Sequence, residues 1–434
     1  MFDYFINLNN ILGNTPLAGS TGEGASAFLN LAIALVIIIT AAKAGGYISI
    51  RLKQPAVLGE LLAGLILGPT LLDFLHWGVF GYSTEFTYGM LVGEINQLAE
   101  IGVLLLMFIA GLDLHLTDLL KSGKIAVLAG SLGVFVPMIL GAGTGLVYNF
   151  GFNEAIFIGL VLSATSVSIS AQTLMELGKL RTRAGIAMLG AAVFDDVLVV
   201  LGLSIFIALS TSGSTGAGDI ALIILRMVLY LVVALGFGFF VLPKLTTLIE
   251  KLPISRGLLA FVFITMLFYA WLAEVVGLVA PITGAFIAGL LFARSSLRDR
   301  IEHEISVVAY GIFVPIFFVS VGLAANLRVL TWETVGLFVV LIIVAIVGKV
   351  LGSGIGAKLG GFTNRESLQM GVGMMSRGEV GLIVANQGIV LGLIGVDVFS
   401  AIVGVVLLTT LLTPILLRRL FTNETPSTTV AQEA

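Results

Sequence analysis

The residues most able to do chemistry are two adjacent aspartates, Asp195 and Asp196, in the apolar run GAAVFDDVLVVLG at residues 190–202. An aspartate at the centre of a membrane helix costs about 3 kcal/mol even on lenient insertion scales. Neighbouring residues on a helix point about 100° apart, so the two carboxylates cannot share one partner symmetrically. One can face a fixed countercharge while the other faces an aqueous cavity. The pair indicates a site for a transported ion or proton, with a purely structural role as the alternative.

Lys349, in the run VAIVGKVLGSG, is the candidate countercharge. It lies about sixteen residues into its predicted membrane span. A lysine near a helix end can instead extend its ammonium group to the membrane surface. Eight more residues of its predicted span follow Lys349, so we expect a buried partner.

The composition indicates whether water or lipid surrounds these residues. Of the 434 residues, 58% are hydrophobic and 11% are charged, whereas soluble domains carry about 25% charged residues. The chain is therefore predicted to be a polytopic protein surrounded by membrane lipid, and its 53 glycines suit helices that pack by close backbone approach. The absence of cysteine excludes disulfides and thiolate metal sites. A net charge of −3 gives no indication of a nucleic-acid partner.

Thirteen stretches are long and apolar enough to span a bilayer, which requires about 20 residues. They lie near residues 28–50, 56–73, 95–113, 124–148, 154–175, 184–210, 218–243, 256–276, 280–295, 305–325, 333–357, 366–391 and 397–418. The loops on one side of these spans collect the basic residues, and that side is predicted to be cytoplasmic. These residues are Arg51, Lys53, Lys121, Lys124, Lys179, Arg181, Arg183, Lys244, Lys251, Arg256, Arg294, Arg298, Arg300, Lys358, Arg365, Arg418 and Arg419. We expect a multi-pass protein of the cell membrane with its N-terminus outside and its C-terminus in the cytoplasm.

An odd number of helices with opposite-facing termini permits two six-helix halves of inverted topology around one linking helix, here the seventh. The fifth helix of each half carries polar residues at mid-depth. In the first half these are Ser163, Thr165, Ser166, Ser168 and Ser170, and in the second they are Arg377 and Glu379 beside Gly378. Paired interruptions of this kind predict discontinuous helices that line an ion site at the membrane midplane. We interpret Arg377 and Glu379 as mainly a structural pair that supports the broken helix, with a direct place in the ion path as the alternative. For the hydroxyl groups of the first half, the alternative to ion ligands is that they only bond within their own helix or join two helices.

Six runs in order along the chain resemble one family of transporters. They are QPAVLGELLAGLILGP (54–69), LSATSVSISAQTLMELG (162–178), GAAVFDDVLVV (190–200), FVPIFFVSVGL (313–323), VGKVLGS (347–353) and SRGEVGLIVA (376–385). The chain resembles the monovalent cation:proton antiporters of the NapA and Kef kind, and is most similar to the NapA-type sodium:proton antiporters. The resemblance implies a core domain with two crossing broken helices, a separate panel of helices that forms a homodimer, and elevator-like alternation of access.

The resemblance also implies roles for individual residues. Asp196 would carry the cation and the proton, and Asp195 would pair with Lys349. Thr165 and Ser166 would supply neutral oxygen ligands near the crossing. No cofactor or resident metal is implied beyond the transported Na⁺ or K⁺ and H⁺.

Two departures distinguish the chain from Kef-type potassium efflux proteins. Those proteins carry a glutamine before the essential aspartate, where this chain has Phe194-Asp195-Asp196, and they end in a large nucleotide-binding domain. The two-aspartate form favours electrogenic exchange of Na⁺ for H⁺, with K⁺ as the alternative cation. We expect residues 1–421 to form one transporter unit and residues 422–434 a short cytoplasmic tail.

Two other classes of protein fit the sequence less well. An intramembrane aspartyl protease also uses two aspartates, but on different helices and with a Gly-x-Gly-Asp signature that is missing here. A channel would need a repeated selectivity filter, and none is visible. We therefore predict a transporter and not an enzyme.

The N-terminal stretch has no basic region before an apolar run, so we predict no cleaved signal peptide. We expect its first dozen residues to lie along the membrane surface.

Overall fold

The computed structural model describes residues 22–422 except 81–84, 115–120, 211–216, 254, 325, 327, 329–331 and 391. The described chain is all-α, as predicted. Its first half forms α2 (Gly22–Arg51), α3 (Ala56–Leu67), the 3-10 turns η1 (Phe74–His76) and η2 (Gly78–Phe80), α4 (Glu85–Leu112), α6 (Gly123–Val147), α7 (Phe152–Ser163), α8 (Val167–Glu176) and α9 (Arg183–Ser210). Its second half forms α10 (Ala217–Phe240), α11 (Leu242–Lys251), α12 (Gly257–Val275), α13 (Pro281–Phe292), α14 (Arg298–Val308), the π-helical turn η3 (Ala309–Phe313), α15 (Val314–Leu323), α16 (Trp332–Leu359), α17 (Asn364–Gly373), α18 (Glu379–Val390) and α19 (Val396–Thr422).

Many of these helices, alone or as consecutive segments, have the length and apolarity of membrane spans. Ten spans in the described part of the chain are long and apolar enough to cross a bilayer, and α3 and α13 are shorter apolar helices. The chain is therefore a multi-pass membrane protein. The total of thirteen spans stays a prediction, and the expected surface segment and tail, residues 1–12 and 422–434, lie almost wholly outside the described residues.

The start of α4 differs from the predicted span near residues 95–113. The helix begins at Glu85, ten residues earlier. Glu85 and Glu94 lower the hydropathy of this segment, which moved the predicted start toward the C-terminus. Glutamate nevertheless forms helices well, so the helix extends beyond the apolar stretch.

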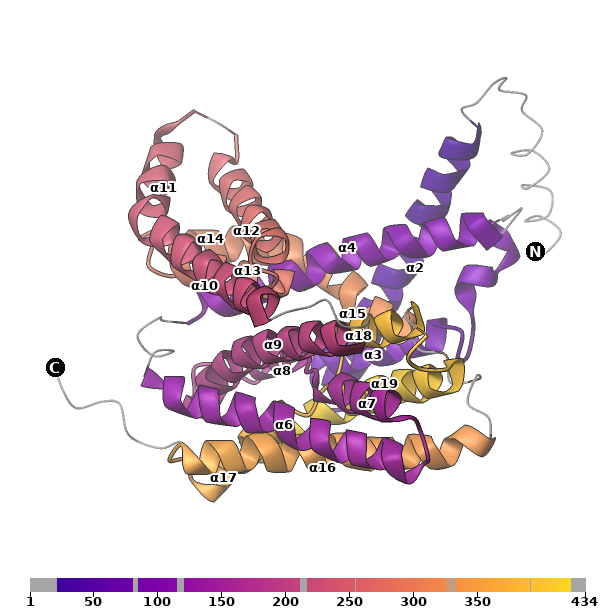
Figure 1. Cartoon of the computed structure of the whole chain (residues 1–434). Coiled ribbons are helices and arrows are strands. Elements are labelled where there is room, and N and C mark those ends of the chain that lie inside the picture. The colour runs from indigo at the N-terminus through magenta and orange to yellow at the C-terminus, as the bar shows by residue number, and fades with distance from the viewer. Residues whose placement is uncertain are drawn as a thin grey trace.

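Packing divides the described helices into two groups, which we name the panel and the core bundle. In the panel, α2, α3, α4, α12, α13, α14 and α15 pack on one another. In the core bundle, α6, α7, α8, α9, α16, α17, α18 and α19 do so. Figure 1 shows α2, α12, α13 and α14 in the upper half of the view and α6, α7, α16 and α17 in the lower half. Helix α10 follows α9 and packs on α13, so it connects the two groups.

Glycine lets the panel helices touch backbone to backbone. A Cβ atom on Gly289 of α13 would lie 2.0 Å from the carbonyl oxygen of Phe108 on α4. A Cβ atom on Gly284 would likewise lie 2.3 Å from the carbonyl oxygen of Tyr269 on α12. Only glycine fits at either position, and this close packing holds α13 firmly between α4 and α12.

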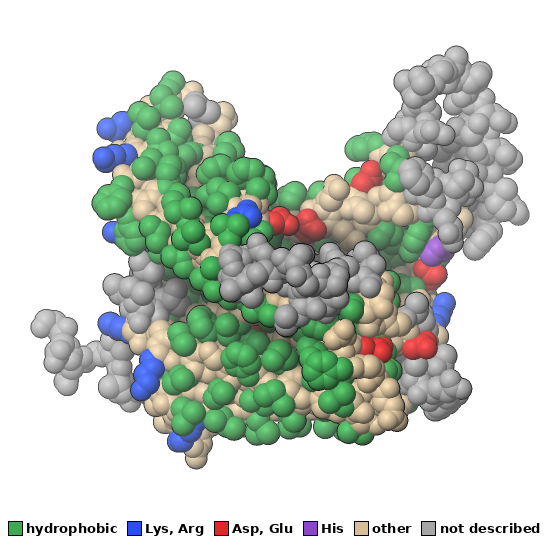
Figure 2. Space-filling model, viewed as in Figure 1, with side chains coloured by type: hydrophobic (Ala, Val, Ile, Leu, Met, Phe, Trp, Pro, Cys, Tyr) green, Lys and Arg blue, Asp and Glu red, His purple; other side chains and the backbone are tan. Residues whose placement is uncertain are grey.

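The surface has the character of a protein surrounded by lipid. Large hydrophobic side chains are exposed along α2, α6, α10, α12 and α16. Figure 2 shows hydrophobic side chains over both halves of the visible face, with most lysine and arginine side chains toward the left edge. Helices α11 and α17 lie toward the same edge in Figure 1. On this face, most of the basic side chains therefore lie at one end of the helix bundle.

Candidate functional site

Both helices that the sequence predicts to be discontinuous are broken at mid-length. In the first, α7 ends at Ser163, and Ala164 and Ser166 have extended backbone before α8 begins at Val167. In the second, α17 ends at Gly373 and α18 begins at Glu379. Each break frees carbonyl groups at one helix end and amide groups at the other.

The two breaks cross in direct contact. The Ser166 amide donates to the carbonyl oxygen of Ser376 over 2.9 Å, and the Ser376 hydroxyl donates to the carbonyl oxygen of Ser166. The Ser170 hydroxyl donates to the carbonyl oxygen of Gly373 over 2.5 Å. A Cβ atom on Gly378 would lie 2.5 Å from the Ser166 side chain, so only glycine permits this approach. The crossing therefore satisfies part of the backbone that the breaks release.

A buried ion pair lies beside this crossing. Lys349 on α16 places Nζ 2.5 Å from Oδ1 of Asp195 on α9, and both side chains are fully buried. The same ammonium group donates to the carbonyl oxygen of Ser163 over 2.8 Å. That carbonyl belongs to the last residue of α7, so Lys349 joins the helix break to Asp195. The second carboxylate oxygen of Asp195 is buried without a hydrogen-bond partner among the described residues.

The other predicted ligands are also buried near the first break. Asp196 is 4% exposed and lines a small cavity of about 10 Å³ between the core bundle and the panel. Thr165 is 2% exposed, and its hydroxyl has no hydrogen-bond partner among the described residues. The Ser166 hydroxyl lies 2.9 Å from that of Ser168. Two carboxylates, one ammonium group and several hydroxyl oxygens are thus concentrated at mid-depth.

Arg377 occupies the second break. Its buried guanidinium group donates to the carbonyl oxygens of Met374 and Met375, just after α17, and to that of Ala345 on α16. A cation at this position also suits the negative end of the α17 dipole. Arg377 lies within electrostatic range of Asp195 and Lys349. The Glu379 side chain lies outside the described residues, so its pairing with Arg377 stays a prediction.

Two threonines that the sequence analysis did not single out support this break. The Thr409 hydroxyl accepts from the Arg377 amide over 3.2 Å, and the Thr410 hydroxyl donates to the Arg377 carbonyl oxygen over 2.5 Å. Both come from α19 and are fully buried. Adjacent threonines in the apolar run VVLLTTLLTP were the signal that could have found them.

We expect Arg377→Gln to lower the stability of the protein by about 3 kcal/mol, because hydrogen bonds from a charged donor contribute about 1.5–3 kcal/mol each and glutamine cannot reach all three carbonyl groups. Thermal unfolding in detergent measures the effect. Arg365→Gln is the matched control, since Arg365 is exposed and donates to a single carbonyl group, that of Leu420. Equal melting temperatures for the two variants would contradict the structural role of Arg377.

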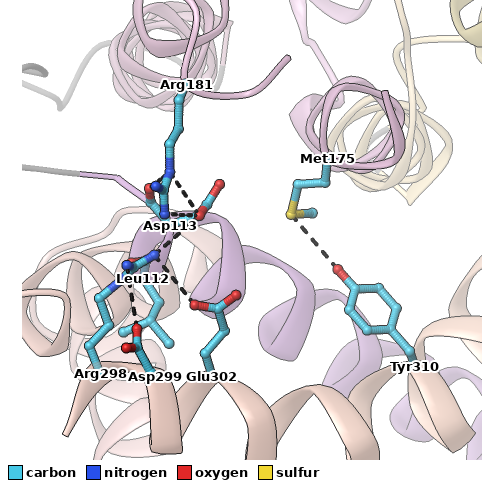
Figure 3. A network of polar contacts seen from close by, with 8 residues as sticks. All are labelled: Leu112, Asp113, Met175, Arg181, Arg298, Asp299, Glu302 and Tyr310. Atoms are coloured by element: carbon cyan, nitrogen blue, oxygen red, sulfur yellow. Dashed lines mark hydrogen bonds and ion pairs between the residues drawn. The ribbon is translucent and has the colours of Figure 1, made fainter. Parts of the chain in front are cut away.

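A second polar network joins the core bundle to the panel at the basic end of the molecule. Asp113, just after α4, accepts from Arg181 in the α8–α9 turn over 2.6 Å and from Arg298 of α14 over 3.2 Å (Figure 3). Nearby, Glu176 at the end of α8 accepts from the amides of Ala56 and Val57, the first residues of α3. These contacts could not be predicted from the sequence, because each joins residues of helices that are far apart in the chain.

Two larger cavities lie at this end of the interface. One of about 560 Å³ is lined by Lys43, Glu60 and Glu176, among others. One of about 360 Å³ is lined by Asp113 and Arg181, among others. Asp196 lines neither of them.

Two crossing broken helices with buried carboxylates beside them define the class of ion-carrying membrane transporters. The chain matches the transmembrane sodium/hydrogen exchanger family over residues 32–422. It is 39% identical to the probable Na⁺/H⁺ antiporter GerT of Bacillus cereus, over 89% of this chain and 98% of that protein. It is 37% identical to the Na⁺/H⁺-K⁺ antiporter GerN of the same organism, over 90% of this chain and 95% of that protein. The chain therefore belongs to the sodium/hydrogen exchanger family and is a cation:proton antiporter, not an enzyme.

Solved structures show the same fold. The sodium/proton antiporter MjNhaP1 of Methanocaldococcus jannaschii superposes with a TM-score of 0.60 at 17% identity, covering 91% of this chain and 96% of that one. A second structure of that protein gives a TM-score of 0.63 at 18% identity. The predicted fold class is thereby confirmed.

Proposed function

We propose that this antiporter exchanges Na⁺ for H⁺ by alternating access, with Asp196 as the group that binds either ion. The observation that carries the proposal is the difference between the two adjacent carboxylates. Asp195 is held by Lys349, whereas Asp196 lines a cavity at the boundary between the core bundle and the panel. Asp195 is thus committed to a fixed ion pair, and Asp196 is the carboxylate placed beside the space that cargo could occupy.

The ligand chemistry suits a hard monovalent cation. Such ions prefer oxygen ligands, and the Asp196 carboxylate can be joined by the hydroxyls of Thr165 and Ser166 and by carbonyl groups that the helix break releases. In the described residues no group of three or more histidine or acidic side chains could hold a resident metal ion. We propose that the cation is cargo and that transport needs no cofactor.

Exchange follows from competition for one carboxylate. A bare carboxylate buried in the membrane is costly, so the core bundle moves when Asp196 is neutralised by a proton or by a cation. One loaded form crosses in each direction, which couples the two fluxes. The Lys349–Asp195 pair adds a charge that can change between the two loaded states, and we propose that transport is electrogenic for this reason.

The remaining elements of the proposal concern assembly and orientation. The panel would form the homodimer contact and stay fixed while the core bundle moves. The end that carries the basic side chains would face the cytoplasm of the cell membrane, with the N-terminus outside. Cross-linking between single cysteines placed on α2 of two copies tests the dimer, since the chain has no cysteine of its own.

Purified protein in proteoliposomes with a proton-gradient dye tests the exchange. We expect Na⁺ and Li⁺ to dissipate an imposed gradient, with K⁺ and Rb⁺ less effective. Exchange of K⁺ for H⁺ is the second candidate, because the relative GerN is named an Na⁺/H⁺-K⁺ antiporter. Dissipation by K⁺ at the same rate and half-saturation as by Na⁺ would favour that candidate. No response to any of the four cations would contradict both.

A further inference from the structure

The small cavity at Asp196 has a second polar wall. Among the described residues that line it, Asp196 of α9 and Thr283 of α13 are the only polar side chains. The others are apolar and come from α4, α8, α9 and α13, among them Met107, Val193 and Phe286. Asp196 belongs to the core bundle, whereas Thr283 belongs to the panel. The cavity therefore places one oxygen-bearing side chain from each group around the same space.

The Thr283 hydroxyl is buried and unpartnered. The residue is 2% exposed, and its Oγ1 has no hydrogen-bond partner among the described residues. A buried hydroxyl without a partner costs free energy, so such groups are rare unless something else binds them.

Its position in the helix explains why the hydroxyl is unpartnered. Threonines inside membrane helices usually donate to the carbonyl group four residues earlier. Thr144, Thr173 and Thr265 do so in this protein. Thr283 is the third residue of α13, which starts at Pro281, and its own amide donates to the Ala280 carbonyl. No preceding helical turn offers the hydroxyl a carbonyl group, and it is left at the cavity.

The panel also holds Thr283 rigidly. Its neighbour Gly284 packs against the backbone of Tyr269 on α12, and Gly289 packs against the backbone of Phe108 on α4. Helix α13 cannot turn or slide without separating these contacts. If the core bundle moves during transport, Asp196 moves away from Thr283.

We propose that Thr283 is a cation ligand supplied by the panel, which completes the site at Asp196 only in the conformation described here. The inference rests on the proposed function. In this conformation the cation would bind the Asp196 carboxylate and the Thr283 hydroxyl oxygen together. After the core bundle has moved, the cation would keep the ligands of the core bundle and lose this one. Thr283 therefore sets the cation affinity of one access state and contributes to the choice among cations.

The inference is tested by removing the Thr283 hydroxyl group while keeping the shape of the side chain. Thr283→Val should raise the KM for Na⁺ in proteoliposomes about tenfold, the size expected for loss of one ligand to a charged group. The maximal rate should change much less. Thr283→Ser restores the oxygen and should restore the KM. Thr265→Val is the matched control in the same panel, because the Thr265 hydroxyl already donates to the Phe261 carbonyl, and its KM should stay within twofold of the original protein.

A merely structural role would not change the order of the cations. We therefore expect Thr283→Val to alter the ratio of KM values for Li⁺, Na⁺ and K⁺, measured at several pH values. If the Val variant does not fold, as judged by gel filtration and thermal unfolding, Thr283→Ala removes the same oxygen in less volume.

Three results would overturn the inference while the original protein still exchanges cations. The first is an unchanged KM and cation order in the hydroxyl-free variant. The second is a shift only in the pH of half-maximal rate, with the pH-independent KM unchanged, since that would make Thr283 a hydrogen-bond partner of the carboxylate and not a cation ligand. The third is a Ser variant that behaves like the Val variant. Failure of the original protein to exchange any cation would instead refute the proposed function.

Discussion

Asp196→Asn is expected to abolish cation:proton exchange and to leave the protein folded. An amide has almost the shape of a carboxylate, so packing around α9 is preserved. It cannot ionise to hold a cation, and it cannot carry a proton at ordinary pH. In the proton-gradient assay, the variant should show no response to Na⁺ above protein-free liposomes, and its thermal unfolding should stay close to that of the original protein.

The control for this experiment is the same substitution at an exposed site. Asp299→Asn changes a side chain that is 96% exposed and lies far along the chain from either helix break. It should retain the exchange rate of the original protein. An Asp196→Asn variant that still dissipated the gradient at close to the original rate would show that another group carries the cargo.

Lys349→Gln should produce the largest loss of stability. It removes the ammonium group 2.5 Å from Asp195 and leaves a fully buried carboxylate without its countercharge. Breaking a buried pair in this way costs about 3–5 kcal/mol. Thermal unfolding in detergent measures it. The double variant, Lys349→Gln with Asp195→Asn, removes both charges. It should recover much of the lost stability, because no charge is then left unpaired.

The same double variant tests the origin of the voltage dependence. Asp196 remains, so we expect exchange of one proton for one cation to survive. Without the Lys349–Asp195 charges, that exchange should be electroneutral. A membrane potential set with valinomycin should change the rate of the original protein and not that of the double variant. Equal voltage dependence in both proteins would remove the pair from the coupling mechanism.

The broken helices show how much of the fold could be predicted. Five hydroxyl-bearing residues between Ser163 and Ser170 interrupt an otherwise apolar run, and Arg377 does so in the other half. Polar residues grouped at equivalent places in the two inverted halves indicate discontinuous helices, so the sequence alone identifies the sites of interruption. The sequence does not show that Ser166 and Ser376 hydrogen-bond across the two breaks, since that contact joins residues 210 positions apart.

The candidate site could likewise be predicted only in part from the sequence. Asp195, Asp196 and Lys349 could be chosen from residue type and depth alone. Their assignment to roles came from a resemblance to a family, because the rotation of α9 relative to α16 cannot be read from either helix. The partners of Arg377 were also out of reach. The sequence offered Glu379 as the nearest charge, and that pairing stays a prediction. The three carbonyl groups that the guanidinium group contacts could not be identified from the sequence.

By itself, the sequence determined that this protein spans a membrane many times and carries charge at its midplane. Both conclusions depend on the free energy of moving a residue from water to lipid, which is a property of residue type and depth. Only the tertiary structure decided which carboxylate Lys349 neutralises and that Thr283 and Asp196 line the same cavity. Those relations depend on how helices distant in sequence turn and approach one another, and glycine contacts such as that of Gly289 on Phe108 set this geometry.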